Sequence, residues 1–488
     1  MNKVSKEQFA NNAMWSFFEI IVKRVISLLI STIIARLLVP EAYGIVALTT
    51  VFITFSDIFL MNGFNVAIVR KERVEADDYS TVMILGLLFS AVVYSLLFLT
   101  APAIAAFYNT PELKNVLRSI TILLFFQAIS AVIRAKATRE LKFKTLSFVS
   151  IISSLSSSVV ALVLAYKGAG VWALVVQQVL NNAIDVLMLT VFFKWKYSWR
   201  FSVSKASEMI KFTMGVLGTS FLDFLGNNAN SLIIGKAYNS TELGFYNRGN
   251  VYPETIALNT YNSINSVLLP TLASRQNDNN EMKKVVRQVV SLSEYIILPL
   301  MIGMIGVSDV FVDVLLTSKW ARCVPVMVCA CLTYAINPIR SIGYNVFYAK
   351  GESNRSIRIE IFRSTAMIIN LLITIVLLKQ SIYVLAASGV LISLMVAGLT
   401  LFQVKKCIGY QFRELFADLL PTAIMCVIML VVVRLTILLP FNNLIILFLQ
   451  LLFGTLSYWI LSVVTKNVNY KFLKEYVLKK IQKGKLHE

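Results

Sequence analysis

Histidine, cysteine and charged residues are scarce in this chain of 488 residues. The one histidine, His487, is next to the last residue, so we expect neither imidazole catalysis nor a proton relay through histidine. Charged residues make up 15% of the chain, far below the roughly 25% of soluble domains, which excludes an ordinary soluble protein. The cysteines lack zinc-site spacing, and we interpret them as small apolar residues: Cys323, Cys329, Cys331, Cys407 and Cys426.

Enzyme motifs are also missing. The sequence has no glycine-rich phosphate loop, no HExxH zinc motif, no GxSxG nucleophile motif and no DxD motif. The longest hydrophilic connector, 194–208, has only fifteen residues, which leaves no room for a catalytic domain outside the membrane. We therefore expect a protein that is not an enzyme and that does not use ATP directly.

Hydrophobic residues, by contrast, make up 57% of the chain and gather in long runs. About fourteen runs come near the ~20 residues that a helix needs to cross a ~30 Å hydrocarbon core. We therefore predict an all-α polytopic membrane protein with spans at 14–38, 42–64, 80–107, 116–134, 145–166, 170–193, 209–238, 249–273, 289–317, 323–348, 359–378, 383–404, 415–439 and 444–465.

The net charge of +20 is distributed unevenly. An even number of spans puts both termini on one side, whose loops hold 32 of the 46 lysines and arginines, against six in the opposite loops. The positive-inside rule therefore predicts cytoplasmic termini, and the basic charge requires no nucleic acid as partner. The basic tail, 466–488, is expected either to lie along anionic lipid headgroups or to form a solvated helix.

An internal repeat appears when the chain is shifted by 200 positions. TIIARLLVPEAYG (32–44) then lies over LIIGKAYNSTELG (232–244), with matched isoleucines, a basic residue and a glycine. Both segments are predicted to be turns between spans, with Gly44 and Gly244 at the turn. Later spans match at offsets of about 205 to 215, which predicts two six-helix bundles of the same orientation.

These matches predict four parts of the chain: 1–200 as an N-terminal bundle, 201–410 as a C-terminal bundle, 411–465 as an appended helix pair, and 466–488 as the tail. The two bundles should be related by a pseudo-twofold axis along the membrane normal.

Polar stripes recur on the matched spans. Glu19, Lys23, Ser27 and Ser31 follow one face of the first span, and Thr219, Asp223, Asn227 and Ser231 stand 200 positions later. A charge at the bilayer centre costs at least ~2.5 kcal/mol, so such faces should line a hydrophilic cavity. The expected cavity residues are Glu19, Lys23, Arg24, Ser27, Asp223, Asn227, Asn230, Asn259 and Arg340. Glu19 and Lys23 could instead form an ion pair that only fixes packing.

Three carboxylates within the spans are candidates for proton or sodium coupling: Asp57, Asp223 and Glu254. The alternative is a structural role, either within the asparagine-rich helices or paired with Lys23 or Arg24. Arg363 is expected to pair with Glu360 or to reach toward the membrane surface. Asp309 and Asp313 lie at the outer end of their span, where hydration accounts for them.

The sequence resembles the polysaccharide-transporter family of the MOP flippase superfamily along its whole length. The motif that carries the resemblance is LGxYNR, here Leu243, Gly244, Tyr246, Asn247 and Arg248, followed by Pro253. Its first-half counterpart is PEAYG, residues 40–44.

The resemblance implies a flippase that moves an undecaprenyl-pyrophosphate-linked oligosaccharide across the bacterial inner membrane by alternating access of the bundles. The implied partners are this lipid-linked substrate, membrane lipids, and a polysaccharide polymerase with other assembly proteins. It implies no cofactor, and it leaves coupling to H⁺ or Na⁺ open. The site would be the polar cavity, in which Lys23 and Arg24 offer positive charge to the pyrophosphate.

Two relatives of the same superfamily are alternatives. A lipid II flippase would share the appended helix pair, whereas a cation-coupled multidrug exporter has twelve spans and expels cations, for which a cavity lined by lysine and arginine is unsuitable. A membrane glycosyltransferase, polymerase or ligase would need a large outer loop with catalytic residues, and the outer loops here are short.

Overall fold

The computed structural model describes residues 28–60, 68, 71, 74–195, 199–378 and 380–475. Within its helices, the side chains at 208, 211–212, 214–223, 225–227, 259, 262–263, 266–267 and 376–377 lie outside this description. The described chain is helical and contains no strand. The predicted all-α membrane fold is therefore confirmed.

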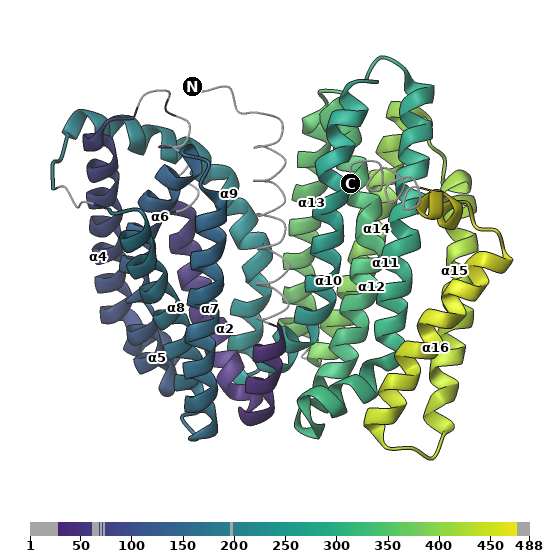
Figure 1. Ribbon diagram of the computed structural model, residues 1–488, viewed down its shortest axis with the longest axis horizontal. Helices are drawn as coiled ribbons and strands as arrows, with labels where there is room; N and C mark the ends of the chain where they lie inside the picture. The colour runs from purple at the N-terminus through teal and green to yellow at the C-terminus, as the bar shows by residue number, and fades with distance from the viewer. Residues whose placement is uncertain are drawn as a thin grey trace, which may run out of the picture. The chain divides into compact units, whose positions relative to one another are not determined.

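The helices follow the predicted spans, apart from the first, of which only the helix Leu28–Leu37 is described. They are α2 (Pro40–Asp57), α4 (Ala76–Phe107), α5 (Glu112–Ile120), α6 (Leu123–Arg139), α7 (Phe143–Tyr166), α8 (Val171–Phe192), α9 (Val203–Ala237), α10 (Ser240–Ala273), α11 (Asn279–Leu316), η2 (Ser318–Cys323), α12 (Val324–Ala349), α13 (Ser353–Leu371), η3 (Leu372–Leu377), α14 (Ile382–Ile408), α15 (Phe412–Leu435), η4 (Thr436–Leu438) and α16 (Asn443–Val464), as Figure 1 shows.

Ten helical stretches among the described residues are long and apolar enough to cross a membrane. The helices α9, α10 and α13 are not among them, and each carries polar residues along much of its length. In α9 these include the residues of the predicted stripe, Thr219, Asp223, Asn227 and Ser231. The apolar helices expose many large hydrophobic side chains, such as Leu99, Val191 and Phe448. Lipid is the solvent that suits such a surface.

The chain forms two compact units, Met1–Asn247 and Arg248–Glu488, and the division falls inside α10. In the first unit, α7 packs along α8, and α4 packs against both α5 and α6. In the second unit, α12 packs along α14 and α11 packs on both α12 and α15. The predicted division of the chain by repeats, with its boundary at residue 200, stays a prediction.

Salt bridges at helix starts tie α4 to α9 in the first unit. Glu75 and Asp78 form a capping box at the start of α4. Lys205 Nζ, from the first turn of α9, lies 2.6 Å from Glu75 Oε2 and 3.6 Å from Asp78 Oδ1. The hydrogen bond to the Glu75 carboxylate raises the pKa of Lys205 above its usual range. The charges of this cluster thus compensate one another locally.

Prolines inside three helices each free a backbone carbonyl four residues earlier, because proline has no N–H to donate. Side chains from other helices donate to these carbonyls. Arg118 Nε donates to Phe98 O, 3.1 Å away, which Pro102 leaves free in α4. In a membrane interior a carbonyl without a donor is costly, so these contacts fix which helices lie together.

The second unit contains two more carbonyls that a proline frees and a side chain of another helix satisfies. Pro299 in α11 frees Tyr295 O, which accepts a hydrogen bond of 2.8 Å from the Tyr458 hydroxyl of α16. Pro338 in α12 frees Tyr334 O, which accepts from the Tyr261 hydroxyl of α10.

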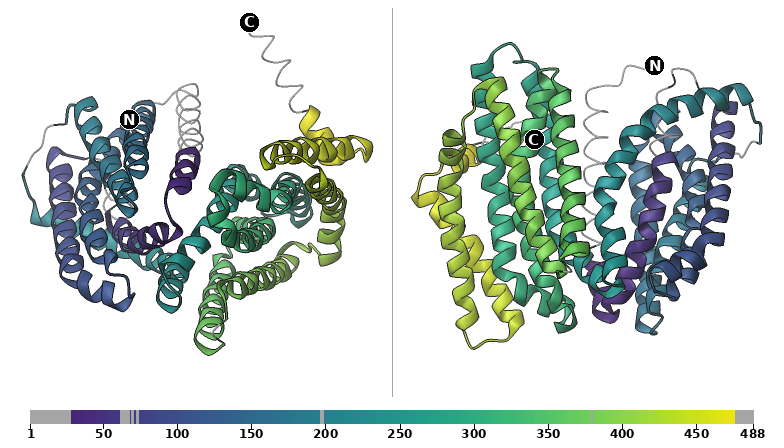
Figure 2. Two further views of the ribbon diagram at one scale, coloured as in Figure 1. Left: turned by 90° about the horizontal axis from the view of Figure 1, so that it is seen from below. Right: turned by 180° about the vertical axis from the view of Figure 1, so that it is seen from behind.

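The helix pair α15 and α16 lies side by side at one edge of the second unit (Figures 1 and 2). Besides the Tyr458 contact, the Tyr295 hydroxyl of α11 bonds to Ser462 Oγ of α16 at 2.8 Å. Arg434 at the end of α15 forms a 2.6 Å ion pair with Asp309 of α11, and Asn443 of α16 donates to Asp313. The predicted appended pair therefore packs on α11. Asp309 and Asp313, which were expected to be hydrated, each have a protein partner as well.

Candidate functional site

Most of the predicted cavity residues fall outside the description. Glu19, Lys23, Arg24 and Ser27 precede the first described residue, and the side chains of Asp223, Asn227 and Asn259 are likewise not described. The described members are Asn230 in α9 and Arg340 in α12. They belong to different compact units.

The repeat motif forms a close helix crossing in the first unit. A Cβ atom placed on Gly44 would lie 1.6 Å from Ser240 O, and one placed on Gly244 would lie 2.0 Å from Pro40 O. Only glycine allows the backbones of α2 and α10 to approach this closely. The two contacts are copies of each other under a shift of 200 positions.

The prediction that Gly44 and Gly244 occupy turns is wrong. Both lie in the first two turns of helices, and the chain changes direction earlier, at residues 38–39 and 238–239. The glycines serve the crossing of two helices, and a glycine at a helix crossing looks the same in the sequence as a glycine in a turn.

Asn230 lies seven residues, about two helix turns, before the end of α9. Its Nδ2 donates a 3.2 Å hydrogen bond to the hydroxyl of Tyr246, the tyrosine of the LGxYNR motif. The motif's arginine, Arg248, is 3% exposed and donates to the Tyr252 hydroxyl at 2.8 Å. The first contact joins α9 to α10 and the second lies within α10, so the motif has a structural role at this helix pair.

Asp57 ends α2 next to a π-helical turn over 58–60. Its Oδ1 atom is buried and has no hydrogen-bond partner among the described residues. Glu254, in α10, is half-buried and belongs to the second unit. Their predicted role in cation coupling stays a prediction, as does that of Asp223.

Arg340 is part of a charged cluster inside the second unit. Its Nη1 lies 3.3 Å from Glu360 Oε2 in α13, and its Nε donates to Asn337 Oδ1 at 2.9 Å. Glu360 also pairs with Arg363 and accepts from the Tyr344 hydroxyl. The expected pairing of Arg363 with Glu360 is confirmed. Two guanidinium groups share one carboxylate, so the cluster carries an excess positive charge that a bound anion could neutralise.

The first unit contains a similar cluster that the sequence analysis missed. Arg134 Nη2 in α6 lies 2.5 Å from Asp185 Oδ1 in α8 and donates to Ser150 Oγ in α7. Arg134 and Arg340 are 206 positions apart, within the offset of the later repeats. That match was visible in the sequence. The partner was not, because Asp185 lies 51 positions from Arg134.

A second pair of basic residues at matched positions donates to backbone carbonyls. Arg139 at the end of α6 donates to Ile68 O and Lys71 O, and Lys350 just after α12 donates to Gln276 O at 2.5 Å. The basic residues are 211 positions apart and Ile68 and Gln276 are 208 apart. Each unit therefore ties the end of a helix to backbone carbonyls that precede an earlier helix, α4 in the first unit and α11 in the second.

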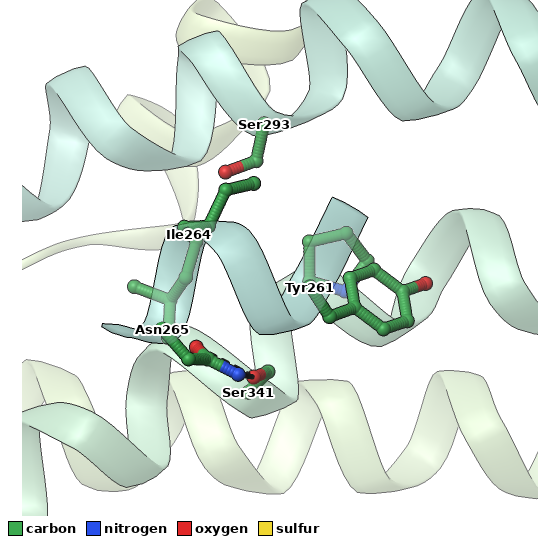
Figure 3. A pocket seen from close by; sticks show the side chains of 7 residues that line it. Tyr261, Ile264, Asn265, Ser293 and Ser341 are labelled. Atoms are coloured by element: carbon green, nitrogen blue, oxygen red, sulfur yellow. Dashed lines mark hydrogen bonds between the residues drawn. The ribbon is translucent and has the colours of Figure 1, made fainter. Parts of the chain in front are cut away.

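An asparagine network borders a small pocket in the second unit, with room for about one water molecule. Asn265 Nδ2 donates to Ser341 Oγ at 2.8 Å, and Asn345 Nδ2 donates to Asn265 Oδ1 at 2.9 Å. Figure 3 shows Asn265 and Ser341 together on one wall, with the Tyr261 ring and Ser293 on others. No group of histidine, cysteine or acidic side chains able to hold a metal occurs among the described residues.

Comparison with solved structures identifies the fold. The fold matches that of the lipid II flippase MurJ in an inward closed conformation, with a TM-score of 0.72 at 17% identity over 93% of this chain and 98% of that one. It also matches an inward-facing MATE multidrug transporter of the MOP superfamily, with a TM-score of 0.59 at 16% identity over 79% of this chain and 94% of that one. The chain is a polytopic membrane protein with the fold of MOP-superfamily transporters.

The family follows from the sequence match. Residues 33–325, more than half of the chain, match the family described as "Polysaccharide biosynthesis protein". The chain belongs to this family, which confirms the resemblance drawn from the LGxYNR motif.

Individual relatives carry related names. The chain is 24% identical over 302 residues to the teichuronic acid biosynthesis protein TuaB of Bacillus subtilis (strain 168), covering 62% of each chain. It is 23% identical over 295 residues to the succinoglycan biosynthesis transport protein ExoT of Rhizobium meliloti (strain 1021), covering 60% of each. It is 20% identical to the lipopolysaccharide biosynthesis protein WzxC of Escherichia coli (strain K12), over 74% of this chain and 73% of that one. The match thus spans about three fifths of the first two relatives.

Proposed function

We propose that this protein is a flippase that moves an undecaprenyl-pyrophosphate-linked oligosaccharide from the inner to the outer leaflet of a bacterial cytoplasmic membrane for surface polysaccharide synthesis. Membership of a polysaccharide biosynthesis family and the transporter fold support this proposal. The product would pass to a polymerase and other assembly proteins. The protein itself would make or break no covalent bond in the substrate.

The observation that carries the proposal is the presence of paired polar and charged groups inside membrane-length helices at matched positions of the two units. Arg134 and Arg340 each sit in such a helix and each bond to a carboxylate of a neighbouring helix. Apolar residues would pack such helices equally well. We infer that their purpose is a hydrated, cationic path for a pyrophosphate-sugar headgroup, while the polyprenyl tail stays in lipid.

The proposed path also includes the residues outside the description: Glu19, Lys23, Arg24, Ser27, Asp223, Asn227 and Asn259. Lys23 and Arg24 would meet the pyrophosphate. The distribution of lysine and arginine supports cytoplasmic termini, so the substrate would enter from the side of the basic loops.

A cell-based experiment tests the function. In a strain without this gene, expression of the wild-type chain should restore surface polysaccharide, and Lys23→Ala should not, although the protein reaches the same abundance. Lys3→Ala, which changes a charge near the terminus, serves as the control and should restore it. Normal amounts of surface polysaccharide with Lys23→Ala would show that Lys23 is not part of the substrate path. Rescue of a strain depleted of its lipid II flippase, without rescue of the polysaccharide, would favour the lipid II alternative.

A further inference from the structure

The last described helix, residues 468–475, follows α16 after a sharp turn and is tied to α11. The chain turns at Lys466, whose φ of 50° lies in the left-handed region. Asn467 Oδ1 then accepts a 2.9 Å hydrogen bond from Asn469 N, which caps the start of the new helix. Asn469 Nδ2 donates to Ser291 Oγ of α11 at 2.8 Å. The helix is therefore held to the second unit at its first turn.

The position of this contact along α11 matches the boundary of the membrane. Arg287 is the last lysine or arginine of α11, and Ser291 follows it by four residues, about 6 Å along the helix axis. The predicted span 289–317 begins at the same place. Figure 1 shows the short helix nearly end-on, whereas α11 and α15 run up the picture, so it lies across the spanning helices. A helix in this orientation and at this depth lies at the level of the lipid headgroups.

The helix 468–475 has three different faces. Asn469 lies on the face toward α11. Val468 and Phe472 are one helix turn apart, so they share a second face, and their side chains are 80% and 58% exposed. Lys471 and Lys474 are exposed on a third face. An apolar strip and a basic strip thus lie beside each other on the part of the helix that α11 leaves uncovered.

The charge of this segment indicates which partner it fits. Residues 466–488 contain seven lysines and two glutamates, and basic segments next to a membrane are attracted to anionic lipids. A stable protein partner would need about 800 Å² on each side, whereas the described helix offers two exposed apolar side chains. A narrow apolar strip beside lysines is the pattern of a helix that lies in the membrane interface.

We propose that the helix 468–475 binds anionic phospholipids in the leaflet on its own side of the membrane. Val468 and Phe472 enter the boundary between the headgroups and the acyl chains, while Lys466, Lys471 and Lys474 bind the lipid phosphates. Because the helix is tied to α11, the bound lipids hold this end of the second unit at a fixed depth. The binding needs no transported substrate and does not depend on the proposed function.

Electron paramagnetic resonance measures the depth of the helix. A spin label is attached to the full-length Phe472→Cys variant, whose native cysteines are replaced, and the protein is reconstituted into vesicles. In vesicles of phosphatidylcholine with phosphatidylglycerol, the label should collide more often with dissolved oxygen, which concentrates in lipid, than with a neutral, water-soluble nickel chelate. In phosphatidylcholine alone, the chelate should reach the label more often. A label on Asn277→Cys, in the exposed turn before α11, is the control and should meet the chelate in both.

Replacement of the lysines tests the contact with phosphate. In the anionic vesicles, the ratio of membrane-bound to water-exposed label should fall about fivefold with each of Lys466→Gln, Lys471→Gln and Lys474→Gln. Replacing the same three lysines with arginine keeps the charge and should keep the ratio, which separates a loss of charge from misfolding. High salt should also lower the ratio in the chain that keeps its lysines, because salt screens exposed charges.

Three results would overturn the proposal. A label that the chelate reaches equally in both kinds of vesicle would show a solvated helix. A label that is equally membrane-bound in both, or after loss of all three lysines, would show that phosphate is not recognised. A label that neither oxygen nor chelate reaches in detergent without phospholipid would show that protein covers the helix. These measurements contain no lipid-linked sugar, so their failure and a failure of the flippase assay are independent of each other.

Discussion

At the scale of single residues, glycine and proline do more in this protein than end helices. Gly44 and Gly244 let two helices touch backbone to backbone, with each Cα beside a carbonyl oxygen of the other helix. Prolines inside α4, α11 and α12 leave carbonyls that neighbouring side chains must satisfy. Such contacts are specific because the membrane interior offers no water as a substitute.

The glycine crossing leads to a stability prediction. Gly44→Ala places a methyl group 1.6 Å from Ser240 O, a backbone atom that cannot move without shifting a helix. We expect a loss of about 1–3 kcal/mol, as for overpacked cores, measured as a lower midpoint of thermal unfolding in detergent. Gly389→Ala is the matched control, because a Cβ there meets nothing within 4 Å. Equal midpoints for the two variants would show that the crossing is not tight.

A second prediction concerns the ion pair in the first unit. Arg134→Ala leaves Asp185 inside the bundle without its cation, and we expect a loss approaching the ~3–5 kcal/mol of a broken buried pair, reduced because both side chains are partly exposed. Combining it with Asp185→Ala should recover much of the stability. A double variant as unstable as the sum of the singles would mean that the two residues act independently.

At the scale of helices, hydropathy predicted where the spans lie, because each must cover the same thickness of hydrocarbon. The contacts between helices could not be predicted in the same way. The sequence places Arg118 inside a span. It does not show that Arg118 donates to the carbonyl freed by Pro102, because that contact depends on how two separate helices pack.

The candidate site was predictable only in part. The polar stripes identified which helices are unusual, and the offset of the repeats could have linked Arg134 to Arg340. The acidic partners Asp185 and Glu360 could not be assigned, because ion pairs between helices follow from packing and not from spacing along one helix. The turn predicted at Gly44 and Gly244 was wrong for the same reason: the partner that explains each glycine lies in the other repeat.

The proline contacts lead to a prediction that pairs two substitutions. Tyr458→Phe removes the donor to Tyr295 O and should lower stability by about 1 kcal/mol, the net contribution of one hydrogen bond. Adding Pro299→Ala supplies a backbone N–H that can donate to the same carbonyl, so the double variant should regain most of the loss. Tyr348→Phe, at a half-exposed position, is the control. If Pro299→Ala restores no stability, the stabilising effect of Tyr458 does not come from its hydrogen bond to Tyr295 O.

At the scale of the whole molecule, the two units use the same devices at matched positions. Arginines inside α6 and α12 pair with carboxylates, basic residues at the ends of these helices donate to carbonyls that precede α4 and α11, and glycines 200 positions apart meet in one crossing. A duplicated chain with paired orientation would produce this pattern. The extra pair, α15 and α16, has its own contacts with α11 and no counterpart among the described helices of the first unit.

The accessibility of the polar stripes can be measured directly. Cysteines introduced at Ser27 and Asn227, in a chain whose native cysteines are replaced, should react with water-soluble thiol reagents because the stripes are predicted to line a hydrated path. A cysteine at the lipid-exposed Leu99 should not react. Inert cysteines at both stripe positions would argue against a path along these helices.

The central claim is that this protein moves a lipid-linked oligosaccharide across a membrane. The most direct measurement reconstitutes the purified chain into vesicles that carry a fluorescent undecaprenyl-pyrophosphate-linked sugar in both leaflets, and then adds outside a membrane-impermeant reductant that destroys the dye irreversibly. With an active flippase all of the fluorescence should be lost, while vesicles without protein or with Lys23→Ala should keep about the half that belongs to the inner leaflet. Wild-type vesicles that also retain that half would contradict the account.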